Sequence, residues 1–238
     1  MSSGSIGPMT SDLDIGDILA RKHPLEAVLF DFDGTLIDTG GLILASFRHT
    51  MREALGRDDL SDEELMRNVG VPLLKQMEEF APGRGEELVA VYRKHNHAHH
   101  DEIAEPFEGV DALLSGVRDL GLPIGIVTSK GQVAFGMGER LIGLDGKVDL
   151  VVTADDVHTH KPDPFPLVYA ADKLGVDVTR TVYVGDSPHD MAAAKAAGSV
   201  AVAALWGMFS EESLVAESPD HVASSPREVL ELLVSLVG

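Results

Sequence analysis

Five short apolar runs recur along the chain. They cover 26–30, 122–128, 148–153, 181–185 and 199–205, and they are rich in β-branched residues. Unbroken apolar runs of this length are typical of strands that are buried on both faces of a parallel sheet. Helical spacing of apolar residues marks the segments at roughly 109–119, 131–142, 164–174, 189–197 and 226–236. This alternation predicts an α/β fold with a doubly wound, Rossmann-like parallel sheet.

About ninety residues between the first and second runs carry helical patterns instead of a strand pattern. The stretch GGLILASFRHTMREALG repeats apolar residues every three or four positions, and SDEELMRNVG opens with a capping-box pattern of Ser61 and Glu64. A crossover between parallel strands needs one helix, so the surplus predicts a separate helical insert. We expect a helical cap over 39–107, a Rossmann-like core formed by 25–38 and 108–238, and an N-terminal extension over 1–24.

Charge and composition narrow the classes of partner. The chain has 238 residues, with 39 acidic and 19 basic side chains, a formal net charge of −20 and no cysteine. Such a surface repels nucleic acid and anionic membranes, so we expect neither as a partner. No stretch reaches the ~20 apolar residues of a membrane span, and the first residues lack the pattern of a secretory signal. We therefore expect a cytoplasmic protein.

The stretch AVLFDFDGTLIDTG, residues 27–40, ends a buried strand in two carboxylates, Asp31 and Asp33. Two like charges 4 Å apart repel by about 4 kcal/mol at an effective dielectric constant near 20, so another group must offset this repulsion. Ligands of open parallel sheets bind at the carboxyl ends of strands. In this chain, polar residues also follow the other predicted strands. These are Thr128, Ser129 and Lys130, then HKPDP at 160–164, then Asp186, Ser187 and Asp190. Their convergence predicts a hard cation bound by oxygens, with Mg²⁺ the natural choice.

Other kinds of site fit the same residues less well. An isolated D-x-D pattern usually forms only a turn. A calcium loop is excluded because Thr35 and Leu36 stand where an acidic or amide ligand and a glycine are needed. The chain lacks the lysine-containing phosphate loop of nucleotide hydrolases, and GMGERLIG at 136–143 has the wrong glycine spacing for a dinucleotide-binding turn.

Four motifs, in the order DFDGTLIDT, IVTSK, HKPDP and VGDSPHDMAAAKAAG, resemble those of the haloacid dehalogenase-like phosphatases. The resemblance covers about 25–238, and the four motifs together are highly specific. An insert directly after the first motif is similar to the helical cap of the family's first subclass. The segments FRHTMREALG, YRKHNHAHHDE and PFEGV resemble the branch of phosphoglycolate phosphatases and bacterial pyrophosphatases.

The resemblance implies a role for each motif residue. Asp31 would be the nucleophile that forms an aspartyl-phosphate, and Asp33 would be the general acid and base. The groups expected to bind the phosphoryl oxygens are Gly34, Thr128, Ser129 and Lys161. The groups expected to bind Mg²⁺ are Asp31, the Asp33 carbonyl and Asp186, with Asp190 in or just outside the coordination shell.

We therefore expect a magnesium-dependent hydrolase of a small phosphorylated substrate, of the phosphoglycolate or pyrophosphate type. A sugar phosphomutase on the same scaffold is the alternative, with Arg67, Asn68, Lys75 and Gln76 as the polar groups that would fix a sugar. A non-catalytic binding or regulatory domain fits less well, because the fold alone does not need such a carboxylate cluster. We interpret His95, His97, His99 and His100 as a solvated helix end and Lys130 as a loop residue. The sequence predicts neither the oligomeric state nor the choice of substrate.

Overall fold

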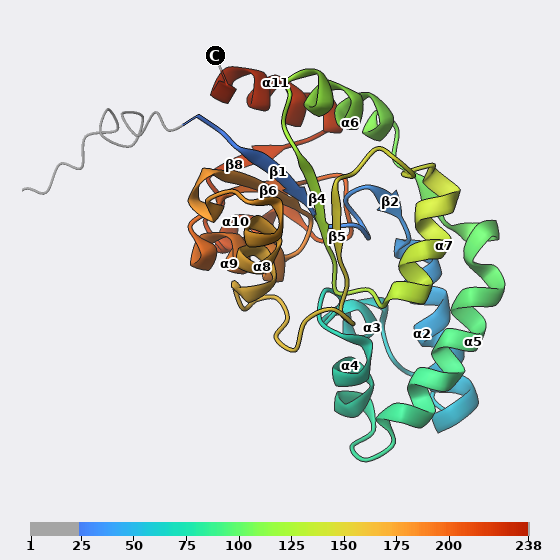
Figure 1. The fold of residues 1–238 in the computed structure, drawn as a ribbon. Coiled ribbons are helices and arrows are strands. Elements are labelled where there is room, and N and C mark those ends of the chain that lie inside the picture. The colour runs from blue at the N-terminus through green and yellow to red at the C-terminus, as the bar shows by residue number, and fades with distance from the viewer. Residues whose placement is uncertain (1–23, 238) are drawn as a thin grey trace, which may run out of the picture.

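A six-stranded parallel sheet forms the centre of the computed structural model, which describes residues 24–237 (Figure 1). Its spatial order is β5-β4-β1-β6-β7-β8. The strands are β1 (Ala27–Phe30), β4 (Ile124–Val127), β5 (Leu150–Val152), β6 (Thr181–Gly185), β7 (Val200–Ala204) and β8 (His221–Ala223). The predicted α/β fold is confirmed. The extension expected over 1–24 lies, except for Pro24, outside the described residues.

Helices cover both faces of this sheet, as the apolar runs predict. In β1, Val28 and Phe30 join one hydrophobic cluster and Leu29 joins the other, because alternate side chains of a strand point to opposite faces. The first cluster is covered by α6 (Val110–Asp119), α7 (Gln132–Ile142) and α11 (Pro226–Val237). The second is covered by α8 (Phe165–Leu174), α9 (Pro188–Ala197) and α10 (Glu211–Ala216).

The chain between β1 and α6 builds a helical segment with a hydrophobic cluster of its own. It contains α2 (Gly40–Leu55), α3 (Asp62–Met66), α4 (Leu73–Phe80) and α5 (Gly85–Ile103). Phe47 is central to the cluster, with its ring 5.9 Å from that of Phe80 and 5.1 Å from that of Tyr92. The predicted capping box of Ser61 and Glu64 is present at the start of α3. The division into a cap over 39–107 and a core is a proposal that agrees with this separate cluster.

The structure also contains short elements that the hydrophobic pattern does not predict. A two-residue pair, β2 (Ile37–Asp38) with β3 (Glu105–Pro106), joins the two points where the chain enters and leaves the helical segment. The edge strand β8, helix α10 and the 3₁₀ turn η1 (Val178–Arg180) are likewise too short to carry a periodic signal. Among the described residues, no helix combines the length and the apolar character needed to cross a bilayer.

Replacing Phe47 tests whether the helical segment depends on its own core. Phe47 is 1% exposed, so Phe47→Ala should lower the free energy of unfolding by about 3–5 kcal/mol, measured by urea titration. Phe165→Ala is the matched control, because Phe165 is 46% exposed at the start of α8 and should cost less than about 1 kcal/mol. Equal losses for the two variants would contradict this description of the segment.

Candidate active site

Four residues from separate parts of the sequence meet at the carboxyl edge of the sheet. Asp31 follows β1, Thr128 follows β4, Lys161 lies in the loop after β5, and Asp186 follows β6. They come together because β1 lies between β4 and β6, so that the chain leaves these strands at one place. This is the position at which open parallel sheets bind their ligands.

The Lys161 ammonium lies at the centre of this group and is almost completely buried. Its Nζ lies 3.0 Å from Asp31 Oδ1 and donates to Asp190 Oδ1 at 2.6 Å. It also donates to Tyr183 Oη at 2.8 Å and to the Val127 carbonyl at 3.2 Å. An ammonium has three protons, and these three acceptors take them. Asp31 Oδ1 is consequently buried beside a positive charge without accepting a hydrogen bond.

Three carboxylates crowd around this ammonium. One oxygen each from Asp31, Asp186 and Asp190 lies within 4.8 Å of the others, and all three residues are buried. Asp186 accepts a hydrogen bond from the backbone N–H of Met208 at 2.7 Å and a long one, 3.3 Å, from Thr35 Oγ1. Three negative charges against one positive charge leave a formal excess of two negative charges in a buried space.

The pKa values reflect this excess. Burial, and then the Asp190 charge, raise the pKa of Asp31 to about 7, although Lys161 opposes the shift. Burial and the charges of Asp190 and Asp31 raise the pKa of Asp186 well above its ordinary value. For Asp190, burial acts in the same direction, but the Lys161 charge and hydrogen bonds hold its pKa below the usual range. The cluster therefore lacks positive charge, and its all-oxygen donor set fits a divalent cation.

Asp190 differs from Asp31 in that both of its carboxylate oxygens accept hydrogen bonds from the protein. It stands at the third position of α9, where its Oδ2 accepts from the N–H of Ser187 at 3.0 Å and from Ser187 Oγ at 2.6 Å. The Ser187 hydroxyl in turn accepts from the Asp190 N–H, which completes a capping box. With Oδ1 on Lys161, Asp190 is better placed to support the neighbouring groups than to bind a ligand itself.

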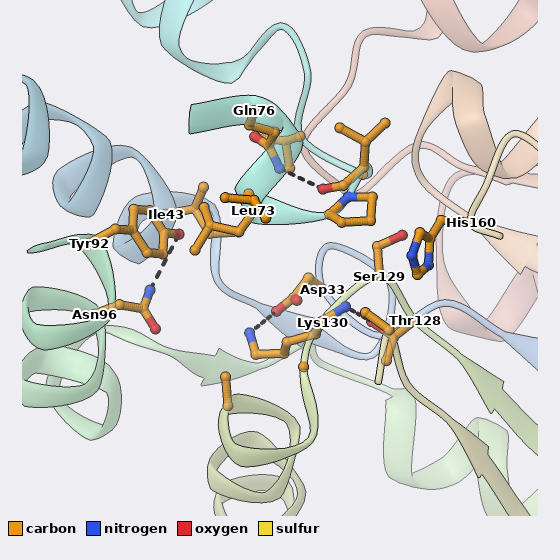
Figure 2. A pocket seen from close by; sticks show the side chains of 18 of the residues that line it. Asp33, Ile43, Leu73, Gln76, Tyr92, Asn96, Thr128, Ser129, Lys130 and His160 are labelled. Atoms are coloured by element: carbon orange, nitrogen blue, oxygen red, sulfur yellow. Dashed lines mark hydrogen bonds and ion pairs between the residues drawn. The ribbon is translucent and has the colours of Figure 1, made fainter. Parts of the chain in front are cut away.

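The Asp33 carboxylate is not a member of this acid cluster and pairs with a lysine instead (Figure 2). Its Oδ1 accepts from Lys130 Nζ at 2.6 Å and from Thr39 Oγ1 at 2.7 Å. The Lys130 backbone serves the loop, as expected, by donating to Thr128 Oγ1 at 3.1 Å. Its side chain does more, because it is only 9% exposed and pairs with Asp33. The sequence analysis missed this contact, which joins residues 97 positions apart.

The residues predicted to bind phosphate have different amounts of free hydrogen-bonding capacity. Thr128 Oγ1 accepts from Lys130, so its own proton is free to donate. Ser129 Oγ is buried and has no partner. The Gly34 N–H donates to the Ile37 carbonyl at 2.9 Å and is engaged within the turn.

Two glycines allow the Asp186 side chain to enter the site. Gly34 has a φ of +77°, and a Cβ at Gly34 or at Gly207 would overlap the Asp186 carboxyl group. No side chain other than hydrogen fits at either position without displacing Asp186. Gly34 belongs to the first motif, whereas the position of Gly207 after β7 carries no signal in the sequence.

These groups open into one cavity of about 430 Å³ beneath the helical segment. Its floor contains Asp31, Asp33 and Asp186 from the sheet edge. The opposite wall comes from α2, α4 and α5 and includes Ile43, Leu73, Tyr92 and Asn96, which Figure 2 shows across the cavity from Lys130. The cavity is therefore acidic at the sheet, whereas its helical side combines apolar residues with the polar side chains of Gln76, Arg93, Asn96 and His97.

The histidines of α5 do not form a metal site in the part of the chain that is described. His95 stacks between His49 and His99, with ring centroids 4.4 and 4.6 Å apart, but their nitrogens do not converge as ligands. The interpretation as a solvated helix end is wrong for His100, which is fully buried on a helix that packs against α2, α4 and α7.

Comparison with known proteins places the chain in a family. Residues 28–204 match the family described as haloacid dehalogenase-like hydrolase. The chain is 38% identical over 209 residues to the pyrophosphatase PpaX of Halalkalibacterium halodurans, covering 88% of this chain and 97% of that protein. A Lactobacillus plantarum structure assigned as a phosphoglycolate phosphatase has a TM-score of 0.78 and 26% identity, covering 88% of this chain and 99% of that one. A Thermotoga maritima structure assigned as a β-phosphoglucomutase has a TM-score of 0.70 and 25% identity, with the same coverage. The chain belongs to the haloacid dehalogenase-like hydrolases.

Proposed function

We propose that this hydrolase is a magnesium-dependent phosphatase that cleaves pyrophosphate or a small phosphomonoester through an aspartyl-phosphate on Asp31. One observation carries the proposal most directly. Asp31 Oδ1 lies buried at the floor of the cavity, 3.0 Å from an ammonium whose protons are taken by other acceptors. A carboxylate oxygen held in one position beside a positive charge, at the floor of the cavity, has the fixed orientation that in-line attack on phosphorus needs.

The formal excess of two negative charges supports a divalent cation, and the oxygen donors support Mg²⁺ in particular. Asp31, Asp186 and the Asp33 carbonyl would hold the ion, with Asp190 behind them on Lys161. When bound, the ion supplies positive charge that reduces the repulsion between the carboxylates and the incoming phosphate. Lys161 contributes in the same way from the protein side.

The proposed reaction has two halves. In the first, an Asp31 oxygen forms a bond to phosphorus, the bond from phosphorus to the leaving oxygen breaks, and Asp33 gives its proton to that oxygen. In the second, water attacks the same phosphorus, Asp33 takes the proton of the water, and orthophosphate leaves while the Asp31 carboxylate is restored. The Thr128 and Ser129 hydroxyls are placed to donate to the phosphoryl oxygens. Gly34 supports the site by admitting Asp186, and its N–H would have to leave the turn to bind phosphate.

We assign Lys130 as a positioning residue for Asp33. The 2.6 Å contact of its Nζ with Asp33 Oδ1, together with the Thr39 hydroxyl, fixes the carboxyl group whose proton the reaction needs. We also propose that the helical segment acts as a cap. Leu74 on the helical side of the cavity and Val133 on the sheet side are exposed apolar residues that closure would cover.

Turnover against a panel of substrates tests the function as a whole. We expect release of orthophosphate from pyrophosphate or phosphoglycolate in the presence of Mg²⁺, since the relatives carry these two names. Hexose phosphates belong in the panel because one structural neighbour is assigned as a phosphomutase. Isomerised sugar phosphate without released orthophosphate would contradict the hydrolase reading.

Substitution of the proposed nucleophile should abolish this turnover. Asp31→Asn preserves the size of the side chain but removes the attacking charge, so orthophosphate release should fall by at least about a thousandfold. Circular dichroism should show that the variant remains folded. Asp145→Asn, an exposed position, is the control and should retain full activity. Substantial turnover by Asp31→Asn would exclude Asp31 as the nucleophile.

Removal of metal should have both a catalytic and a thermodynamic effect. Excess chelator should abolish turnover, Mg²⁺ should restore it, and Ca²⁺ should support it poorly because its looser coordination misplaces the reacting oxygens. Saturating Mg²⁺ at a hundred times its dissociation constant should also stabilise the fold by about 2.7 kcal/mol. Asp186→Asn should lose most of this stabilisation, whereas the exposed Asp119→Asn should keep it. Full activity in excess chelator would refute the metal assignment.

The effect on kcat of replacing Lys130 should depend on the leaving group of the substrate. Lys130→Met should lower kcat about tenfold to a hundredfold on an alkyl phosphate, whose leaving oxygen needs the Asp33 proton. It should change kcat by less than about threefold on an activated aryl phosphate, which needs little protonation. Lys173→Met is the control, since Lys173 lies over the Tyr169 ring on α8 and outside the cavity. An equal loss on both substrates would show a merely structural role.

A further inference from the structure

Helix α5 contributes two basic side chains to the wall of the cavity. Arg93 and His97 lie one turn apart, so they share a face of the helix, and both line the cavity that also contains Asp31 and Lys130. Tyr92 and Asn96, which Figure 2 labels, precede them by one position each on α5 and are buried, with a long hydrogen bond of 3.5 Å between their side chains. Because Tyr92 and Asn96 are buried, this face of α5 is turned inward. Arg93 and His97 each stand next to it along the helix.

Neither basic side chain has a partner within residues 24–237. Arg93 and His97 form no hydrogen bond and no ion pair with any residue in that range. Arg57, Arg84 and Arg180 are each paired with a carboxylate, whereas Arg67 and Arg140 are also unpaired but do not line the cavity. With a formal net charge of −20, the chain has carboxylates in excess. What distinguishes Arg93 is its place, since it is an exposed and unpaired guanidinium on the wall of the cavity.

The titratable side chains that α5 contributes to the cavity, apart from Tyr92, are basic. Burial lowers the pKa of His97, and the further charges that lower it, those of Arg93, His100 and Lys130, are all positive. No carboxylate offsets them at His97. Because the floor of the cavity carries the acid cluster, the two sides of the cavity have opposite character.

The position of Lys130 relates this wall to the reaction. Lys130 pairs with Asp33 at 2.6 Å and is also among the charges that act on His97. In the proposed function, Asp33 protonates the oxygen that joins the transferred phosphoryl group to the rest of the substrate. The rest of the substrate then begins at the oxygen beside Asp33 and lies in the same cavity that Arg93 and His97 line.

We propose that Arg93, assisted by His97, binds a second anionic group on the departing part of the substrate. The guanidinium fork matches both a phosphate and a carboxylate, so the shared chemistry is a compact oxyanion two to four bonds from the transferred phosphorus. The second phosphoryl group of pyrophosphate and the carboxylate of phosphoglycolate both satisfy this description. The inference rests on the proposed function. It explains in addition why Arg93 and His97 of α5 face the cavity without a partner.

The experiment compares substrates that have or lack the second anion. Arg93→Gln should raise KM for pyrophosphate or phosphoglycolate roughly tenfold to a hundredfold, because a charge-assisted hydrogen bond is lost. The KM for ethyl phosphate should not change. If ethyl phosphate is turned over too slowly for a KM, its inhibition constant as a competitor of the substrate should not change. Arg93→Lys should recover part of the loss, since it keeps the charge without the fork. Arg140→Gln is the matched control, an exposed arginine of α7 that does not line the cavity.

The outcomes separate this inference from the proposed function. A wild-type protein that hydrolyses none of the panel overturns the proposed function. An active wild type whose Arg93→Gln variant is unchanged, or is weakened equally on ethyl phosphate, overturns the second-anion site and leaves the phosphatase standing. A loss confined to pyrophosphate identifies a phosphate as the second anion, and a loss confined to phosphoglycolate identifies a carboxylate.

Discussion

The buried charge at Lys161 is the constraint on which the site depends. One ammonium holds Asp31 and Asp190 at 3.0 and 2.6 Å, while Asp186 completes a cluster with more negative than positive charge. Removing charges from water is unfavourable unless they are paired or protonated, so this buried excess raises the pKa of Asp31 and Asp186 and favours the binding of a further cation. The surrounding structure is arranged to maintain it, through the capping box of α9 and the two glycines that admit Asp186.

The sequence predicts the sheet and its catalytic edge well for a physical reason. Strands β1, β4, β5, β6 and β7 are covered on both faces, so each produces an apolar run that ends where the chain leaves the core. A polar residue directly after such an apolar run is easy to recognise in the sequence as a residue at the carboxyl end of a strand. In β8, His221 and Val222 are exposed, and α10 has only six residues, so neither carries a comparable pattern.

The parts of the site that could not be predicted depend on long-range packing. Lys130 looks like an ordinary loop residue until the fold brings it to Asp33, and Gly207 acquires its role only because Asp186 approaches it. The face of α5 that meets the cavity is fixed by how the helical segment packs over the sheet, which periodicity within the helix does not reveal. Arg93 and His97 therefore lie in a motif that resembles a family branch, but their place in the cavity comes from the structure alone.

The central claim is that Asp31 carries the phosphoryl group between the two halves of the reaction. Rapid acid quenching during turnover of the best substrate, followed by proteolysis and mass spectrometry of the peptides, measures this directly. The account predicts a phosphoryl group on the peptide that contains Asp31, assigned to that residue by fragmentation and lost on treatment with hydroxylamine. A phosphoryl group trapped on any other residue, or turnover with no covalent intermediate at any time point, would contradict it.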